Sequence, residues 1–458
     1  MEKPVRTFLQ TTFILFALGI FVQAQPALVT EVPDGSRNLV KIGEFVYFTS
    51  GDSLLRTDGT AAGTIFLKSG IFSSPGSFTG FNGMAYFTSS PDPANVNSPL
   101  KELWRSDGTP SGTILLKTSS EYDLQILRGA GDFLFFRATD SATGHELYRT
   151  NGTAAGTMLV KDINPGSADG FSGSAAAVGN SLLFAADDGT NGAELWKSDG
   201  SSGGTVMIKD INPGASDGFG TSPFQFLPFT VFSYNNQFYF TGITPENGTE
   251  PWVSDGSAAG TTILQDIVPG PESRGRIQHT IAHNGVLYFI VFPDTILYPS
   301  SPRDLWKTAG TMASTVKVKT LGDEDSEHSY HPFLIYNDKV HFFDNNSVVS
   351  VLWVTDGTET GTFPFFSLDT HEGGVNYFAE VNDYLLFTSS QQSIPNPLFR
   401  SDGTNQGTQE ITQFESKWFV SDDRHITQVD LTTVNDYAFY TDHDGPEDGY
   451  EKHNRLRS

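Results

Sequence analysis

The sequence contains no cysteine. This absence excludes disulfides, thiolate metal sites and cysteine nucleophiles, so packing and hydrogen bonding must stabilise the fold. Basic residues are also few: 28 Lys and Arg stand against 53 Asp and Glu, which gives a net charge of -25. A protein needs a basic face to replace phosphate counterions, so we expect neither nucleic-acid binding nor adhesion to anionic membranes.

Long apolar runs are missing after the first residues. The apolar segment 13–22 follows Lys3 and Arg6 and precedes a small-residue pattern that ends at Ala24. The segment is shorter than the roughly 20 residues that a membrane-spanning helix needs. An uncleaved anchor is the alternative, but the pattern is typical of a signal peptide. We predict a signal peptide at residues 1–24, no membrane span after its cleavage, and a protein that is secreted or held at the cell surface.

One twelve-residue pattern occurs eight times. Its reference copy is ELWKSDGSSGGT at residues 194–205, and the copies begin at Ser53, Glu102, Glu146, Glu194, Glu250, Asp304, Val351 and Pro397. The spacing of the turn glycine varies between 44 residues (108 to 152) and 56 residues (200 to 256). A period of this size is typical of a propeller blade.

The segments around each copy predict strands. Nine stretches alternate aromatic or β-branched residues with others, from EFVYFTS at Glu44 to DYAFYTD at Asp436. Another strand follows the motif, as in TMLVKDINPG at Thr157 and TVMIKDINPG at Thr205, where Pro-Gly closes it. A weaker strand follows near residues 174–178 or 278–283. Four antiparallel strands per unit predict an all-β protein, a β-propeller of about eight to nine four-stranded blades. An open β-solenoid is the alternative.

The two ends of the predicted domain, residues 25–458, look complementary. LVTEVPDGS at Leu28 resembles the strand LVKDINPGS at Leu159, and the chain end from Val434 lacks such a strand. We therefore expect the ring to be closed by pairing N- and C-terminal segments, which would hide the last sheet edge. The last copy reads YEKHNRLRS, so the final blade is either degenerate or truncated.

The motif also carries a family resemblance. The core ELW-x-[ST]-DGT-x-x-GT followed by VKDI-x-PG is similar to the ELWxxDGT repeat of bacterial exported and surface proteins, and it covers essentially the whole chain after residue 24. The resemblance implies an extracytoplasmic location and a propeller, and it implies no reaction or substrate. Ala309 and Ser314 in the sixth copy depart from the pattern.

We interpret the motif as a structural turn. Asp-Gly after an apolar strand predicts a tight hairpin, in which Gly supplies positive φ and the Asp carboxylate accepts main-chain N–H groups. Ala309 has no such carboxylate, and a catalytic role shared by all copies could not survive that change. Five of the six Trp belong to the motif, and their recurrence predicts packing between blades. Trp418 lies outside this register.

Two groups of residues could bind a metal. Acidic loops before the motif strand resemble oxygen-rich calcium loops, and they supply five weak calcium candidates: Asp187, Asp188, Asp442, Asp444 and Asp448. The histidines His279, His283, His328, His331 and His341 are close enough in sequence to form clusters, but without carboxylates in fixed register we expect strand or surface histidines. We expect plain acidic hairpin loops and no cofactor, with calcium as the alternative.

No catalytic residue can be assigned. GxSxG, P-loop, GxGxxG and HExxH patterns are absent, and the separation of carboxylates across a propeller cannot be derived from sequence. We expect a monomeric, non-enzymatic scaffold that presents variable loops and binds protein or glycan. Two alternatives stay open: a propeller-type glycosidase or lyase with its site at the channel mouth, and a calcium-stiffened structural or adhesive repeat protein.

Overall fold

A computed structural model describes most of the repeat region. The described residues are 5–9, 27–32, 36–60, 62–71, 78–90, 100–119, 124–219, 231–271, 273–295, 303–321, 333–345, 349–369, 375–381, 384–389, 397–413, 432–434, 437–444 and 453–457. Apart from a short 3-10 helix, η1 at Met312–Ser314, the regular structure in these ranges is β-strand. Within these ranges no helix is long and apolar enough to cross a membrane.

Eight units of four antiparallel strands form the repeat region, and we call them blades 1 to 8. The strands of blades 1 to 4 are β3 Ser36–Ile42, β4 Phe45–Ser50, β5 Ser53–Thr57, β6 Ile65–Ser69, β7 Phe78–Phe81, β8 Met84–Ser89, β9 Lys101–Ser106, β10 Ile114–Ser119, β11 Leu124–Ala130, β12 Phe133–Asp140, β13 Gly144–Thr150, β14 Met158–Lys161, β15 Phe171–Val178, β16 Ser181–Asp187, β17 Ala193–Ser198 and β18 Val206–Lys209. Those of blades 5 to 8 are β19 Phe232–Tyr234, β20 Gln237–Thr244, β21 Gly248–Ser254, β22 Thr262–Ile263, β23 Ser273–His283, β24 Val286–Thr295, β25 Asp304–Thr308, β26 Val316–Thr320, β27 Phe333–Tyr336, β28 Lys339–Asn345, β29 Val349–Thr355, β30 Phe363–Asp369, β31 Val375–Val381, β32 Tyr384–Ser389, β33 Pro397–Ser401 and β34 Gln409–Gln413.

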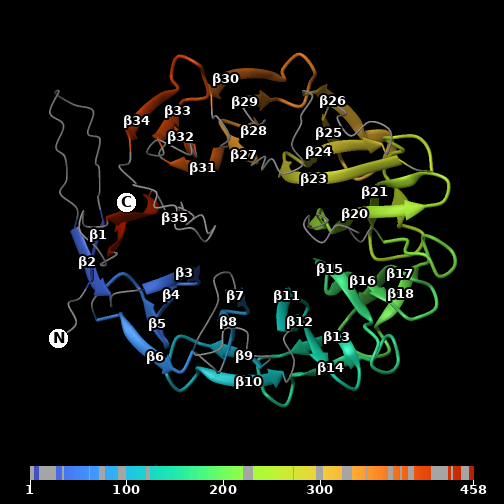
Figure 1. The fold of residues 1–458 in the computed structure, drawn as a ribbon, viewed down its shortest axis with the longest axis horizontal. Coiled ribbons are helices and arrows are strands. Elements are labelled where there is room, and N and C mark those ends of the chain that lie inside the picture. Colours follow the sequence, from blue (N-terminus) through green and yellow to red (C-terminus); the bar gives the residue numbers. More distant parts are fainter. Residues whose placement is uncertain are drawn as a thin grey trace, which may run out of the picture.

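The sheets fan around a common centre, with β3, β7, β11 and β15 innermost and β6, β10, β14 and β18 outermost (Figure 1). This arrangement confirms the predicted propeller of four-stranded blades. The weak strand at residues 174–178 begins a blade, since β15 pairs with the aromatic strand β16. Blades 5 and 6 are also joined by one parallel pair between Thr249 and Arg274.

The chain ends form two further small sheets. Strand β1 (Val5–Leu9) pairs with β2 (Ala27–Val32), and β35 (Thr432–Val434), β36 (Tyr437–Asp444) and β37 (His453–Arg457) form a three-stranded sheet. Both lie between β34 and β3 in Figure 1. The expected partner of the C-terminal sheet, β2, is therefore paired with β1, a strand of the predicted signal peptide. Closure of the ring through β2 stays a prediction.

The core lies between neighbouring blades. The cluster that joins blades 3 and 4 contains Phe135 and Leu147 of one blade and Phe171, Phe184 and Trp196 of the next, all of them buried. Phe171 stacks on Phe184 with ring centroids 5.7 Å apart. Alternation along each strand directs these side chains between the sheets, where burial of each is worth about 1.5–3 kcal/mol. The predicted role of the motif Trp in blade packing is confirmed for Trp196.

Lysine and arginine side chains of one blade donate to main-chain carbonyls in the motif of the next blade. Lys197 Nζ in blade 4 donates to Gly256 O, the turn glycine of blade 5, at 3.0 Å. The same type of bond joins Arg56 to Gly108, Lys307 to Gly357, Lys161 to Thr205 and Lys209 to Thr261. The motif turns of blades 2, 4, 5 and 7 are therefore held by the blade before them.

The antiparallel order of the strands gives the propeller two different faces. The turn between the first two strands and the turn between the last two emerge on one face, which we call the motif face because it carries the motif turns. The opposite face carries the loops before the motif strand, such as residues 187–192, and the connections between blades, such as residues 210–218. We call it the loop face.

Candidate functional site

The motif turn is a closed network of hydrogen bonds. In blade 4, Asp199 Oδ1 accepts from the N–H and the hydroxyl of Ser201, at 2.8 and 2.7 Å. Ser201 Oγ accepts from Gly204 N–H, and the Thr205 hydroxyl donates to Ser201 O. The eight turn glycines have φ between 86° and 93°. The predicted structural turn is confirmed, and the hydrogen bonds from Ser201 lower the pKa of Asp199.

Gly204 is required by the same network. A Cβ at this residue would lie 2.2 Å from Asp199 Oδ1. The equivalent glycine meets the equivalent Asp or Asn in six further copies: Gly63, Gly112, Gly156, Gly260, Gly361 and Gly407. The position of the Asp side chain therefore requires Gly as the second-last residue of the motif.

The sixth copy shows how that coupling is satisfied without Asp. Ala309 replaces the Asp, and Ser314 replaces the Gly. Ser314 Oγ accepts from Ala309 N–H at 3.0 Å and from Thr311 N–H at 3.1 Å. A hydroxyl on one side of the turn therefore substitutes for a carboxylate on the other, which supports a structural role for the motif.

Three motif glutamates form a second recurring feature, on the loop face, which the sequence analysis missed. Glu146, Glu194 and Glu250 are completely buried. Glu194 Oε2 accepts from Ile211 N–H at 2.7 Å, and its Oε1 accepts from Asn212 N–H at 3.2 Å. Each Glu thereby fastens the connection that leads to the next blade.

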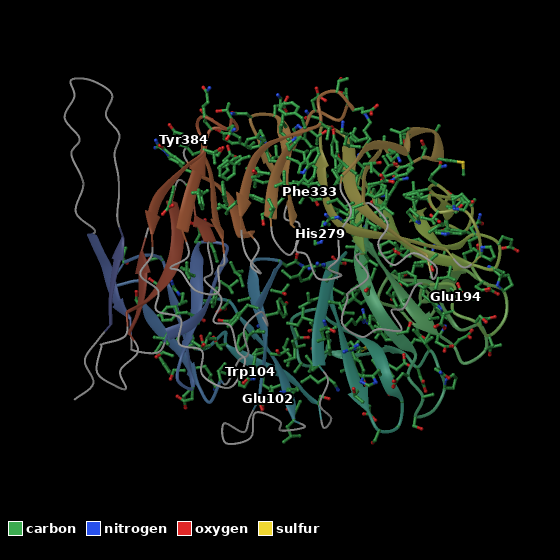
Figure 2. The ribbon with its side chains drawn as sticks, turned by 45° about the horizontal axis from the view of Figure 1, so that its top comes forward. Glu102, Trp104, Glu194, His279, Phe333 and Tyr384 are labelled. Atoms are coloured by element: carbon green, nitrogen blue, oxygen red, sulfur yellow. The ribbon has the colours of Figure 1, made fainter. Side chains whose placement is uncertain are left out.

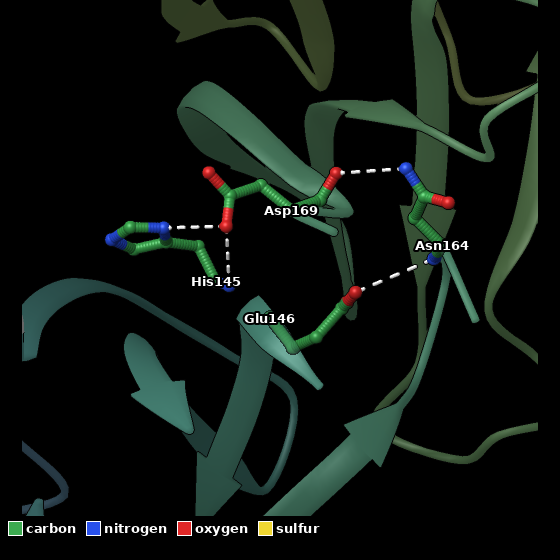
Figure 3. Close-up of polar contacts among 4 residues, drawn as sticks. All are labelled: His145, Glu146, Asn164 and Asp169. Atoms are coloured by element: carbon green, nitrogen blue, oxygen red, sulfur yellow. Dashed lines mark hydrogen bonds and ion pairs between the residues drawn. The ribbon is translucent and has the colours of Figure 1, made fainter. Parts of the chain in front are cut away.

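Figure 3 shows this connection in blade 3, where Glu146 Oε1 accepts from Asn164 N–H at 3.4 Å. Asn164 Nδ2 donates to Asp169 O, and Asp169 Oδ1 accepts from the main-chain N–H of His145 and contacts His145 Nδ1 at 2.7 Å. Gly170 is needed beside them, because a Cβ there would lie 2.2 Å from Glu146 Oε1.

An Asp follows each buried Glu by sixteen residues: Asp162, Asp210 and Asp266. Burial raises the pKa of Glu146 and Glu194 to about 7 and that of Glu250 to about 8, and the charge of the neighbouring Asp adds to each rise. The constant spacing of Glu and Asp was a signal in the sequence, but only the fold shows that the two interact electrostatically.

Of the predicted calcium candidates, only Asp187 and Asp188 have described side chains, and both lie on the loop face. Asp187 and Asp188 belong to a loop-face loop, where Asp187 Oδ1 accepts from Gly189 N–H and Asp188 Oδ1 from Thr190 N–H. Asp442 and Asp444 belong to β36, but their side chains, like Asp448 altogether, lie outside the described residues.

The histidines are dispersed. His283 Nε2 contacts Asp338 of the next blade at 3.2 Å, and His279 lies in β23 (Figure 2). Burial lowers the pKa of His341 to about 4 in the core of blade 7. His328, His331 and Trp418 lie outside the described residues. In the described ranges, no three or more His, Asp or Glu side chains form a group suited to a metal ion.

No family model matches the chain, and no curated protein matches it in sequence. Solved structures do resemble it. A eukaryotic initiation factor is 10% identical with a TM-score of 0.47, over 85% of this chain and 91% of that one. A prolyl endopeptidase is 10% identical with a TM-score of 0.41, over 79% of this chain and 55% of that one, and the tricorn protease is 14% identical with a TM-score of 0.27, over 93% and 43%. The chain thus spans about half the length of these two proteases.

Proposed function

We propose that this chain is an exported, non-enzymatic β-propeller scaffold that binds a protein or a glycan through its loop face, as a monomer in the secreted or surface-held state. The observation that carries the proposal is the contrast between the two faces. On the motif face the recurring polar groups bond to their own turn, as Asp199 does to Ser201.

The loops of the other face differ from blade to blade. They read DSATG at residues 140–144, DDGTNG at 187–192 and TPENG at 244–248. The first residues after them enter the rigid strands β13, β17 and β21. Variable loops on a rigid ring suit recognition, because loops that the scaffold already orders lose less conformational entropy when they bind a ligand.

A binding screen on two arrays tests the proposal. The chain without residues 1–24 is applied to a glycan array and to a peptide array. Any reproducible ligand is then tested on a variant in which loop 188–191 is replaced by residues 141–143. The matched control is Ser201→Thr on the motif face, since Thr stands there in most other copies.

We expect the loop exchange to weaken binding at least tenfold and Ser201→Thr to leave it unchanged. Binding that is lost in Ser201→Thr and kept in the loop exchange would contradict the use of the loop face. Reproducible turnover of an array ligand, abolished by one loop carboxylate substitution, would contradict the non-enzymatic part.

A further inference from the structure

A buried Glu lies close enough to an Asp to feel its charge in each of three successive blades. The pairs are Glu146 with Asp162, Glu194 with Asp210, and Glu250 with Asp266, and in each pair the Asp charge raises the pKa of the buried Glu. Like charges brought together out of water repel each other strongly. The same arrangement nevertheless recurs three times.

One oxygen of each Asp in these pairs has no hydrogen-bond partner. The Glu side chains are completely buried and accept main-chain N–H groups of the connection that follows, as Glu146 does from Ile163 and Asn164. The Oδ1 atoms of Asp162, Asp210 and Asp266, by contrast, are buried without a partner. A buried acceptor without a donor costs about 1–3 kcal/mol, and more when it is charged. Because an unpartnered Asp oxygen recurs at three equivalent places, a bound group is the simplest partner for these oxygens.

The nearby lysines do not neutralise the pairs. Lys161 and Lys209, which directly precede two of the Asp residues, donate to Thr205 O at 2.9 Å and Thr261 O at 2.8 Å in the next blade. None of the ion pairs within the described ranges involves any of the six carboxylates.

Blades with a single acid at these positions behave differently. Glu102, which has Thr118 sixteen residues later, accepts from the neighbouring Trp104 Nε1 at 2.9 Å (Figure 2). Asp304 accepts from the Thr320 hydroxyl at 2.6 Å. In blade 4, by contrast, both oxygens of Glu194 accept main-chain N–H groups. The lone acids thus bond to side-chain donors, whereas the buried Glu of each pair bonds to main-chain N–H groups.

We propose that each of the three Glu–Asp pairs binds a hard divalent cation of the calcium class. Carboxylate oxygens are the ligands that Ca²⁺ prefers, and main-chain carbonyls and water can complete its six to eight ligands. In blade 5 the loop-face residue Asn247 donates to Asp266 Oδ2 at 3.2 Å, so a cation there would also brace a variable loop. The inference does not depend on the proposed binding of protein or glycan.

Calorimetric titration of Ca²⁺ into the EDTA-stripped full chain tests the proposal. We expect three bound ions, with a Kd on the order of 10⁻⁴–10⁻³ M as in extracellular calcium modules. Asp162→Asn, Asp210→Asn and Asp266→Asn should each remove one ion. Because each single variant keeps two pairs, its stoichiometry can be measured even if a triple variant does not fold. Ca²⁺ should also raise the melting temperature of the stripped chain.

Asp199→Asn is the matched control, since it lies in the exposed motif turn of the same blade and Asn151 stands at the equivalent place in blade 3. We expect it to keep all three ions. No uptake of Ca²⁺ by the parent chain, or uptake that the three Asp→Asn variants do not reduce, would overturn the proposal and leave a shared proton as the occupant of each pair.

Discussion

At the scale of single residues, neighbouring glycines of one turn have opposite roles. A Cβ at Gly203 would meet no atom within 4 Å, whereas a Cβ at Gly204 would overlap Asp199. We expect Gly203→Ala to raise the free energy of unfolding by about 0.4–1 kcal/mol, because Ala restricts the unfolded chain. Gly204→Ala should lower it by about 1–3 kcal/mol through overpacking. Chemical denaturation of both variants checks this, and equal effects would contradict the assigned turn geometry.

His341 makes stability depend on pH at a single residue. Burial lowers the pKa of His341 to about 4, below its usual value of 6.5. The folded state therefore favours the neutral ring, so this contribution to stability is fully present above pH 6.5 and is lost as the pH falls toward 4. His341→Phe keeps an aromatic ring against Tyr336 and Phe365. Melting temperatures between pH 7 and 4 should fall less in the variant than in the parent, and equal slopes would exclude His341 as the cause.

At the scale of the element, the sixth motif hairpin differs from the other copies at two linked positions, Ala309 and Ser314. Ala309→Asp alone would place a carboxylate beside the Ser314 side chain, and Ser314→Gly alone would remove the hydroxyl that accepts from Ala309 N–H. We expect both single variants to be less stable than the parent and the double variant to recover, with a coupling of about 0.5–3 kcal/mol. A double-mutant cycle by denaturation measures it, and additive effects would contradict the proposed exchange.

The elements also show what sequence reasoning could reach. Alternation in segments such as residues 181–187 identified the strands, and repetition identified the turn and the blades, because both are local patterns. The meeting of Glu194 with Asp210 was out of reach, since it depends on how the connection between blades folds back over β17. The partners of Asp442 and Trp418 also depend on tertiary contacts, and their side chains lie outside the described residues.

At the scale of the whole molecule, the N-terminal strands are the part of the chain that we predict to close the ring. Strand β1 belongs to the predicted signal peptide and pairs with β2, the strand expected to complete the last blade. Cleavage after Ala24 would free β2 for the C-terminal sheet. We expect a chain that begins at Gln25 to melt no lower than the full chain, and a chain that begins at Ser36 to melt several degrees lower. Equal melting of the two shortened chains would contradict closure through β2.

The central claim is that the repeated motif builds the propeller and that function lies elsewhere. Substitution of a functional residue commonly leaves stability unchanged or improves it, whereas substitution of a structural one lowers it. The most direct measurement is the free energy of unfolding of Asp199→Ala. Because Asp199 accepts two hydrogen bonds from Ser201, the account predicts a loss of roughly 1–3 kcal/mol. An unchanged or raised stability would contradict it.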